Sequence, residues 1–144
     1  MITFKNNCND LPYLMFQNKY ELARSAKQDF IEAISISSYS SELNEVDSRF
    51  VNLKFVNNKE FIFFTNFNSP KSIQFKAHNQ IAVVIFWSKI NLQIRMKASI
   101  KKIKSKDSYD YFRTRSSEKN ALSISSNQSK KINSYKDIQD NYNI

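Results

Sequence analysis

Alternating apolar and polar residues between positions 47 and 93 constrain the fold most, because a period of two is typical of a β-strand with one buried face. The alternation predicts a strand over 48–56, with Arg49, Val51, Leu53 and Phe55 on one face and Phe50, Asn52 and Lys54 on the other. Asn57-Asn58 is a hairpin signal, since Asn tolerates positive φ. Further strands are predicted at 60–65, at 80–87, which is the most apolar, and at 91–104.

The remaining segments predict one more strand and several short helices. Residues 1–9 are expected to be a loose polar arm, and Asp10 can cap a helix over 11–27. That helix is expected to cover a barrel opening with the face formed by Leu11, Leu14, Met15, Leu22 and Ala26. A strand over 30–37 should place Phe30, Ile34 and Ile36 on one side. Ser69-Pro70 begins a helix that ends near His78, and two more helices are predicted at 105–115 and 117–125.

Five or six strands with short helices predict a mainly β fold with α additions, built as a six-stranded Greek-key barrel. The chain has 144 residues, which suits one domain. Within it we expect the helix at 11–27, the barrel at 29–104, helices at 105–126 and a polar tail at 127–144. No glycine is present, so no glycine-rich dinucleotide fingerprint exists and every turn must use other residues.

The formal charge of +9 favours anionic partners such as phosphorylated ligands. The single Cys8 cannot form an intramolecular disulfide, and no secretory leader is visible, so a cytoplasmic protein is expected. The longest apolar run, 81–87, is too short for a membrane helix. His78 has no metal-ligating neighbours at a suitable spacing, and we expect no metal site.

A phosphate site is the first candidate for chemistry. Arg49, Lys54, Thr65, Ser69 and Lys71 fall at strand ends and at a helix start. Helix N-termini and arginine forks both suit phosphate oxygens. The alternative is a solvated strand face with an ordinary helix cap.

Two further patterns are open to more than one interpretation. Tyr111 and Arg115 are four residues apart and could present a hydroxyl and a guanidinium to one anion, or form a surface stack. The basic run at 97–106 could bind nucleic acid, but its place on an alternating strand favours a solvated outer face.

Several motifs in order resemble the pyridoxamine 5′-phosphate oxidase family, whose members are FMN-binding split barrels. RFVNLK at 49–54 is similar to the family's R-x-V-L-L-K, FFTN at 64–67 to Y-T-N, and SPK at 69–71 to S-R-K. Gln93 falls at the glutamine of the R-Q-V segment. YFRTR at 111–115 resembles Y-F-x-S-R, and NQS at 127–129 resembles a Q-S pair.

The resemblance implies roles for individual residues. FMN would be bound by Arg49, Phe50, Val51, Asn52, Leu53, Lys54, Phe64, Thr65, Ser69, Lys71, Gln93, Gln128 and Ser129. The substrate phosphate would be held by Lys54, Tyr111, Arg115 and Lys119. The implied partners are a second copy in a homodimer, pyridoxamine, pyridoxine or pyridoxal 5′-phosphate, and oxygen as electron acceptor. No individual side chain is implied as catalytic, since the flavin carries the chemistry.

The sequence departs from the family pattern at several of these positions. Phe64 stands where the family has a tyrosine, Pro70 where it has a phosphate-binding arginine, and Lys119 where it has a serine. Family members also continue beyond the position of Ile144 into strands that carry a tryptophan and an R-x-H segment. The resemblance implies FMN-dependent oxidation of pyridoxamine or pyridoxine 5′-phosphate to pyridoxal 5′-phosphate. The departures predict that the vitamer phosphate binds but that its oxidation is slow or absent. A protein that binds FMN or a vitamin B6 phosphate without oxidase activity is the alternative, and a basic nucleic-acid-binding module is a more distant one.

Overall fold

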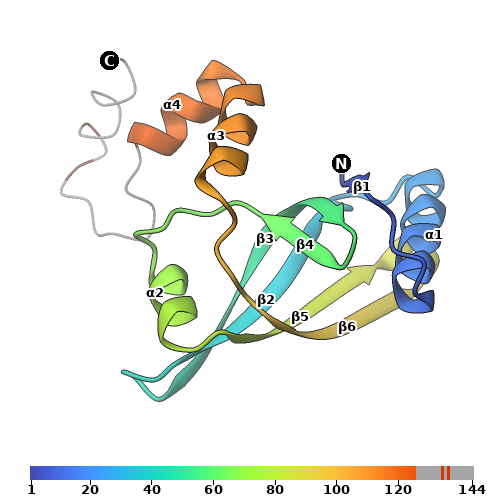
Figure 1. The fold of residues 1–144 in the computed structure, drawn as a ribbon, viewed down its shortest axis with the longest axis horizontal. Helices are drawn as coiled ribbons and strands as arrows, with labels where there is room; N and C mark the ends of the chain where they lie inside the picture. Colours follow the sequence, from blue (N-terminus) through green and yellow to red (C-terminus); the bar gives the residue numbers. More distant parts are fainter. Residues whose placement is uncertain (126–133, 135, 137–144) are drawn as a thin grey trace.

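The computed structural model describes residues 1–125, 134 and 136, and it places a bent β-sheet at the centre of the chain (Figure 1). The strands are β1 (Thr3–Lys5), β2 (Ala33–Ser40), β3 (Glu45–Asn57), β4 (Glu60–Phe63), β5 (Gln80–Trp87) and β6 (Leu92–Ser99). The helices are α1 (Leu11–Ser25), α2 (Pro70–Ala77), α3 (Ser105–Thr114) and α4 (Ser117–Ser125), with the 3-10 turn η1 (Ser88–Ile90). The expected fold class, mainly β with added helices, is confirmed.

The six strands form one sheet in the order β1-β3-β2-β5-β6, and β4 also pairs with β3. All pairs are antiparallel except β1 with β3. The long strand β3 pairs with β2 over its first part and with β4 and β1 over its last part. A register shift between Leu53 and Phe55 marks a bulge at the change of partner. Because a bulge bends a strand, β3 takes part in both halves of the bent sheet: it pairs with β2 before the bulge and with β4 and β1 after it.

The bulge corrects the predicted alternation of this strand. Leu53 is fully buried as expected, but beyond the bulge Val56 is buried and Phe55 is only half-buried. An extra residue in one strand shifts every later side chain to the opposite face. The predicted strand at 91–104 is also too long, because β6 ends at Ser99 and the chain then crosses towards α3 (Figure 1).

The hydrophobic core lies between one face of the sheet and α1. Ile36, Leu53, Ile85 and Trp87 are at most 1% exposed. The Trp87 indole Nε1 donates to the Ile31 carbonyl oxygen at 3.1 Å. Helix α1 contributes Phe16, Tyr20 and Ala23. The helix therefore covers the barrel as predicted, but with a different face.

The predicted apolar face of α1 is wrong because its aliphatic residues point outward: Leu11, Met15 and Leu22 are 50% exposed or more. The buried stripe is aromatic instead, since the rings of Phe16 and Tyr20 reach Trp87, with centroids 5.7 and 6.1 Å away. The prediction for Phe30 is also wrong. This residue has φ 49° and is 85% exposed, because it lies in the turn before β2 and not within the strand.

The N-terminal segment is ordered by the core rather than forming a loose arm. Thr3–Lys5 pair in parallel with residues 55–57 of β3. Ile2 is buried, and its backbone N–H donates to the Tyr20 hydroxyl at 3.1 Å. A pairing between segments about 50 residues apart leaves no local signal in the sequence.

Turns without glycine use residues with side chains at positive φ. In the described part of the chain these are Asn6, Lys27, Phe30, Asn44, Asn58 and Asn91. Asn58 lies at the predicted β3–β4 hairpin, where asparagine tolerates the left-handed region.

Candidate functional site

The candidate site begins with Arg49, whose guanidinium lies between β3, β2 and α2. Its Nη1 donates to the Ser38 hydroxyl at 2.6 Å, and its Nη2 donates to the Gln74 side-chain oxygen at 3.0 Å. The same Nη2 is 2.5 Å from the Asp47 carboxylate. The Ser38 hydroxyl in turn donates to Gln74 at 2.5 Å. This network holds the guanidinium in one orientation with its side chain only 18% exposed.

Lys71, in the first turn of α2, is the second cation of the site. Burial lowers the pKa of the Lys71 ammonium, and the positive charge of Arg49 lowers it further. Asp47 acts in the opposite direction but does not compensate fully. Among the described residues, Arg49 and Asp47 are the charged groups that act on Lys71, so two cations and one carboxylate leave net positive charge at a half-buried place. An anion such as a phosphate would relieve this repulsion, so these residues fit the phosphate of FMN.

Two serine hydroxyls join the first turn of α2 to the loop that precedes it. Ser69 and Ser72 are both buried, and each hydroxyl donates to the Asn66 carbonyl oxygen at 2.7 Å. Ser69 is the N-cap residue by position, but its side chain makes no cap hydrogen bond. Its hydroxyl and its backbone N–H both donate to the Asn66 carbonyl oxygen, so Ser69 fixes the loop before α2.

Lys54 lies apart from the Arg49–Lys71 pair. It is five residues along β3 from Arg49, which at about 3.3 Å per residue is roughly 17 Å. Its ammonium is 3.8 Å from the Glu32 carboxylate, which is also 3.5 Å from the N-terminal ammonium. Burial raises the pKa of Glu32, but a backbone hydrogen bond and these two cations lower it by more. Lys54 is thus a cation on the same strand as Arg49, but it is paired with Glu32 and lies away from Arg49 and Lys71.

Phe64 and Tyr111 are brought into direct contact. Their rings stack with centroids 3.7 Å apart and an interplanar angle of 8°. Phe55 meets both rings edge-on, with centroids 6.2 and 5.9 Å away. This aromatic cluster fastens α3 to β3 and to the segment after β4. Thr65 follows Phe64 and lines an apolar cavity.

Arg115 does not share a helix face with Tyr111, contrary to the prediction. Helix α3 ends at Thr114, and Arg115 is its C-cap in an extended conformation. Its guanidinium instead donates to the Lys119 carbonyl oxygen at 2.9 Å and lies near the Phe112 ring. Arg115 and Lys119 are therefore close to each other across the α3–α4 junction.

The remaining predicted residues fall in three places. Phe50, Asn52 and Gln93 are exposed on strands β3 and β6. Val51 is half-buried and Leu53 is fully buried, so only the backbone of Leu53 could reach a ligand. Gln128 and Ser129 lie outside the described residues.

Sequence reasoning missed Asp47, Ser38 and Gln74, which surround the Arg49 guanidinium. Ser38 continues the inward positions of Ile34 and Ile36 along β2, so a longer predicted strand would have placed it inside. Gln74 follows Lys71 by three residues on α2, which puts both on neighbouring turns.

Two lysines of the exposed basic run at 97–106 contact other side chains. Lys101 pairs with Glu60, and the Lys102 ammonium lies 4.5 Å from the centre of the Phe67 ring. In the described part of the chain no cluster of three His, Cys, Asp or Glu residues could hold a metal. No helix there is long and apolar enough to span a membrane.

Comparison with known proteins decides the family. Residues 32–140 match the family model described as pyridoxamine 5′-phosphate oxidase. This chain belongs to the pyridoxamine 5′-phosphate oxidase family. A pyridoxine/pyridoxamine 5′-phosphate oxidase of Colwellia psychrerythraea is 32% identical over 124 residues, which are 86% of this chain and 57% of that protein. One from Vesicomyosocius okutanii is 30% identical over 92% of this chain and 61% of that protein. The chain thus spans about three fifths of the length of these relatives.

Solved structures confirm the split-barrel fold. PhzG from Burkholderia lata, in complex with tetrahydrophenazine-1-carboxylic acid, superposes with a TM-score of 0.87 at 17% identity and covers 92% of this chain and 65% of that one. A pyridoxamine 5′-phosphate oxidase-related, FMN-binding protein of Nostoc punctiforme gives a TM-score of 0.67 at 11% identity, covering 86% of this chain and 70% of that one. At these identities the likeness concerns the fold alone.

Proposed function

We propose that this chain binds FMN, with the flavin phosphate held by Arg49 and Lys71. The observation that carries this proposal is the half-buried pair of cations, in which the charge of Arg49 helps to lower the pKa of Lys71. Family membership supports the same cofactor, as does the FMN-binding protein of the same fold. FMN would supply a hydride acceptor, and the residues of this chain would bind and orient it.

The flavin ring requires a surface beyond the phosphate site. Phe50, Asn52 and Gln93 share the exposed outer face of the sheet with Phe86, which is 58% exposed and pairs with Gln93 across β5 and β6. Phe50 is 77% exposed on the same face. Exposed aromatic side chains on one sheet face are typical of an interaction surface. We propose that a second copy covers this face and that FMN lies between the two.

The proposed reaction is oxidation of pyridoxamine or pyridoxine 5′-phosphate, with oxygen reoxidising the flavin. The relatives named for this activity support it. The cations Arg115 and Lys119 at the α3–α4 junction and the Tyr111 hydroxyl of α3 also support it. Lys54, Tyr111, Arg115 and Lys119 would hold the substrate phosphate. Tyr111 contacts Phe55 of β3, which is the residue after Lys54.

A binding protein without oxidase activity is the second candidate. Two observations favour it. Pro70 stands in the first turn of α2, where the family motif has a cation. Tyr111 is stacked on Phe64, and Arg115 donates to a backbone carbonyl, so both groups would have to rearrange to meet a substrate.

Titration with FMN and with riboflavin tests the cofactor assignment, because the two differ only in the phosphate. We expect FMN to bind at least tenfold more tightly, since charge-assisted contacts contribute about 1.5–3 kcal/mol. Lys71→Ala should remove most of this preference. Lys104→Ala, which removes an exposed lysine from the segment before α3, is the matched control. Equal affinity for the two flavins would contradict the assignment.

Peroxide release separates the two candidate functions. FMN-saturated protein is mixed with pyridoxamine 5′-phosphate under air, and binding is followed in parallel by calorimetry. Turnover at roughly 1 per second or faster supports the oxidase. Vitamer binding without peroxide supports the binding protein.

A further inference from the structure

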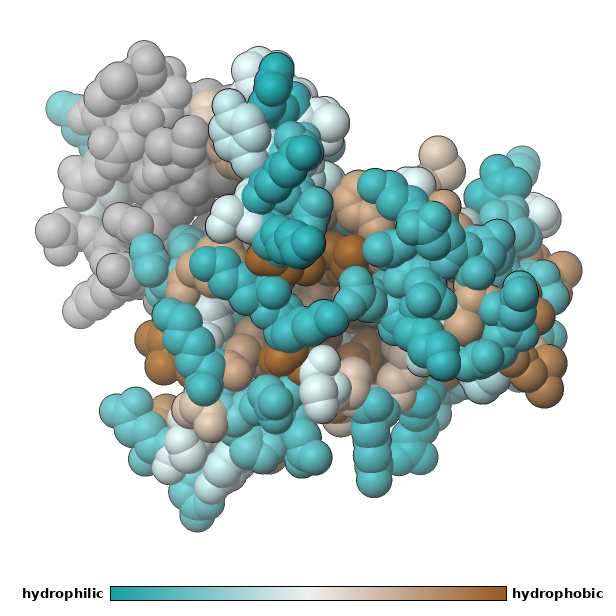
Figure 2. All heavy atoms as spheres, in the orientation of Figure 1, coloured by the Kyte–Doolittle hydropathy of each residue, from teal (hydrophilic) through white to brown (hydrophobic). Residues whose placement is uncertain are grey.

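The barrel interior holds a cavity that is separate from the cation pair. Its volume is about 670 Å³, within the range of small-molecule sites. The walls are apolar side chains from four strands and α2: Ile34, Ile36, Phe63, Phe75, Val83 and Met96. Neither Arg49 nor Lys71 lines it, and of the expected FMN residues only Phe64 and Thr65 do. In Figure 2, brown apolar atoms are visible between hydrophilic side chains near the middle of the molecule.

The charges around the cavity are unequal. Four lysines line it, namely Lys59, Lys76, Lys101 and Lys102, against one carboxylate, Glu60. Lys101 pairs with Glu60 across the opening, and Lys59 is 2.5 Å from the Asp10 carboxylate. Among the described residues, the Lys76 and Lys102 ammonium groups have no carboxylate partner at ion-pair distance, and that of Lys102 lies 4.5 Å from the centre of the Phe67 ring.

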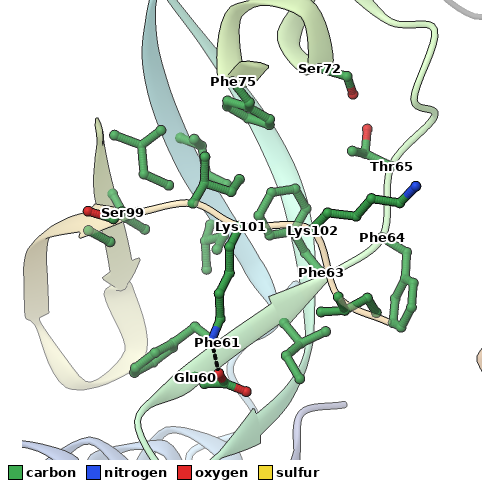
Figure 3. A pocket seen from close by; sticks show the side chains of 18 of the residues that line it. Glu60, Phe61, Phe63, Phe64, Thr65, Ser72, Phe75, Ser99, Lys101 and Lys102 are labelled. Carbon is green, nitrogen blue, oxygen red and sulfur yellow. Dashed lines mark ion pairs between the residues drawn. The ribbon is translucent and has the colours of Figure 1, made fainter. Parts of the chain in front are cut away.

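One end of the cavity is polar. Figure 3 shows the Lys102 side chain extending towards the end at which Thr65 and Ser72 carry their hydroxyls, while Phe61, Phe63 and Phe75 line the apolar part. The Ser72 hydroxyl donates its proton to the Asn66 carbonyl oxygen. A ligand that matches this layout has an apolar body and an anionic head.

We propose that this cavity binds an amphipathic monocarboxylate, such as a medium-chain fatty acid, with its chain among the β-strands and its carboxylate at Lys76 and Lys102. Apolar burial supplies most of the affinity. The two lysines select an anion over a neutral or cationic head. This site differs from the proposed phosphate site of FMN in its cations, since neither Arg49 nor Lys71 lines the cavity.

Calorimetry with three probes that share one chain tests the proposal. The probes are decanoate, decanol and decyltrimethylammonium, all below their micelle concentrations, with the purified 144-residue chain. We expect decanoate to bind one to one and at least tenfold more tightly than the other two. Equal binding of decanoate and decyltrimethylammonium would overturn the proposal, as would no binding of decanoate.

Variants assign the head and the body of the ligand. The double variant Lys76→Gln/Lys102→Gln should weaken decanoate about tenfold or more and leave decanol unchanged. Lys104→Gln is the control for a lysine outside the cavity. Met96→Trp and, independently, Ala98→Leu should fill the cavity and weaken all chain binding. Circular dichroism and thermal melting identify which of these variants are folded, and undiminished binding to a folded one would overturn the proposal.

Two more measurements distinguish the cavity from the cation pair and from an interface between two copies. Lys71→Ala should leave decanoate affinity unchanged, and Met96→Trp should leave FMN affinity unchanged. A loss of decanoate binding in Lys71→Ala would place the carboxylate at the cation pair and contradict the cavity site. A change of oligomeric state in the cavity-filling variants, without decanoate binding to the parent chain, would make a second copy the occupant and also refute the proposal.

Discussion

The ring of Tyr111 lies flat against the ring of Phe64, with centroids 3.7 Å apart. One residue is expected to bind the substrate phosphate and the other to contact FMN, so the stack joins the two halves of the proposed site. Phe64 replaces a tyrosine of the family motif, and its ring is kept while its hydroxyl is not. A stacked pair contributes about 0.5–1.5 kcal/mol beyond the area that it buries.

Substitutions at Tyr111 separate its two roles. Tyr111→Phe keeps the stack and removes only the hydroxyl, so we expect an unchanged melting temperature with several-fold weaker binding of pyridoxal 5′-phosphate. Tyr111→Ala should lower both. Calorimetric titration and thermal melting of the two variants provide the measurement. If Tyr111→Phe binds the vitamer phosphate as well as the parent chain, the hydroxyl has no part in recognition.

Lys71 should stabilise the complex with FMN and destabilise the ligand-free protein. Its pKa in the folded chain is lower than its ordinary value, so the charged form disfavours folding at neutral pH. That penalty diminishes as the pH rises through the folded pKa towards the ordinary one. We expect Lys71→Met to raise the melting temperature without ligand and to weaken FMN. Inorganic phosphate should stabilise the parent chain more than the variant.

The pH dependence of FMN binding follows from the same shift. Affinity should fall as the pH rises through the lowered pKa of Lys71, at a less alkaline pH than an ordinary lysine would give. Lys71→Arg, whose guanidinium stays charged, should retain affinity further into the alkaline range. Parallel titrations across the alkaline range measure both, and coincident pH profiles would show that Lys71 does not set the dependence.

The exposed sheet face predicts a homodimer that is sensitive to charge. Phe86 is 58% exposed on β5, so Phe86→Glu should shift sedimentation from dimer to monomer and weaken FMN together with it. Leu22→Glu is the matched control, because Leu22 is 54% exposed on α1 and away from this face. A parent chain that is monomeric at micromolar concentration with FMN bound would contradict the dimer.

The N-terminal strand predicts a stability effect at Tyr20. The hydroxyl of this buried residue accepts the only hydrogen bond described for the Ile2 N–H, at 3.1 Å. Tyr20→Phe leaves that buried donor without its partner, which should lower the free energy of unfolding by about 1–3 kcal/mol. Urea denaturation measures the change. Tyr13→Phe, on the half-buried part of α1, should have a much smaller effect.

Local patterns predicted the elements whose signals lie within a few residues. Strand β5 has the predicted bounds 80–87, and the helix at 70–77 ends one residue before the predicted His78. Asn58 forms the expected hairpin with positive φ. By contrast, the parallel pairing of β1 with β3 depends on contacts between distant segments. The buried face of α1 could not be predicted, because the helix carries apolar residues on two faces. Packing against Trp87 buries the face with the aromatic residues Phe16 and Tyr20.

In the candidate site, too, some features could be predicted from local motifs, and others depend on contacts between distant segments. Motif spacing predicted that Arg49 and Lys71 lie in one region, and the charge of Arg49 does act on the Lys71 ammonium. It could not supply Ser38 and Gln74, which orient the Arg49 guanidinium only once β2 and α2 are packed together. Nor could it foresee that α3 ends one residue before Arg115, since helix ends depend on how the following segment packs.

The glycine-free turns affect the unfolded chain as well as the folded one. Lys27 and Phe30 have φ values of 55° and 49°, which raises the energy of the native backbone. The same side chains restrict the backbone of the denatured ensemble, which glycine would leave freer. Phe30→Gly would relieve the strain in one state and enlarge the conformational entropy of the other. The free energy of folding at these turns therefore depends on two opposing contributions. Backbone strain raises the enthalpy of the native state, and restricted backbone freedom lowers the conformational entropy of the denatured state.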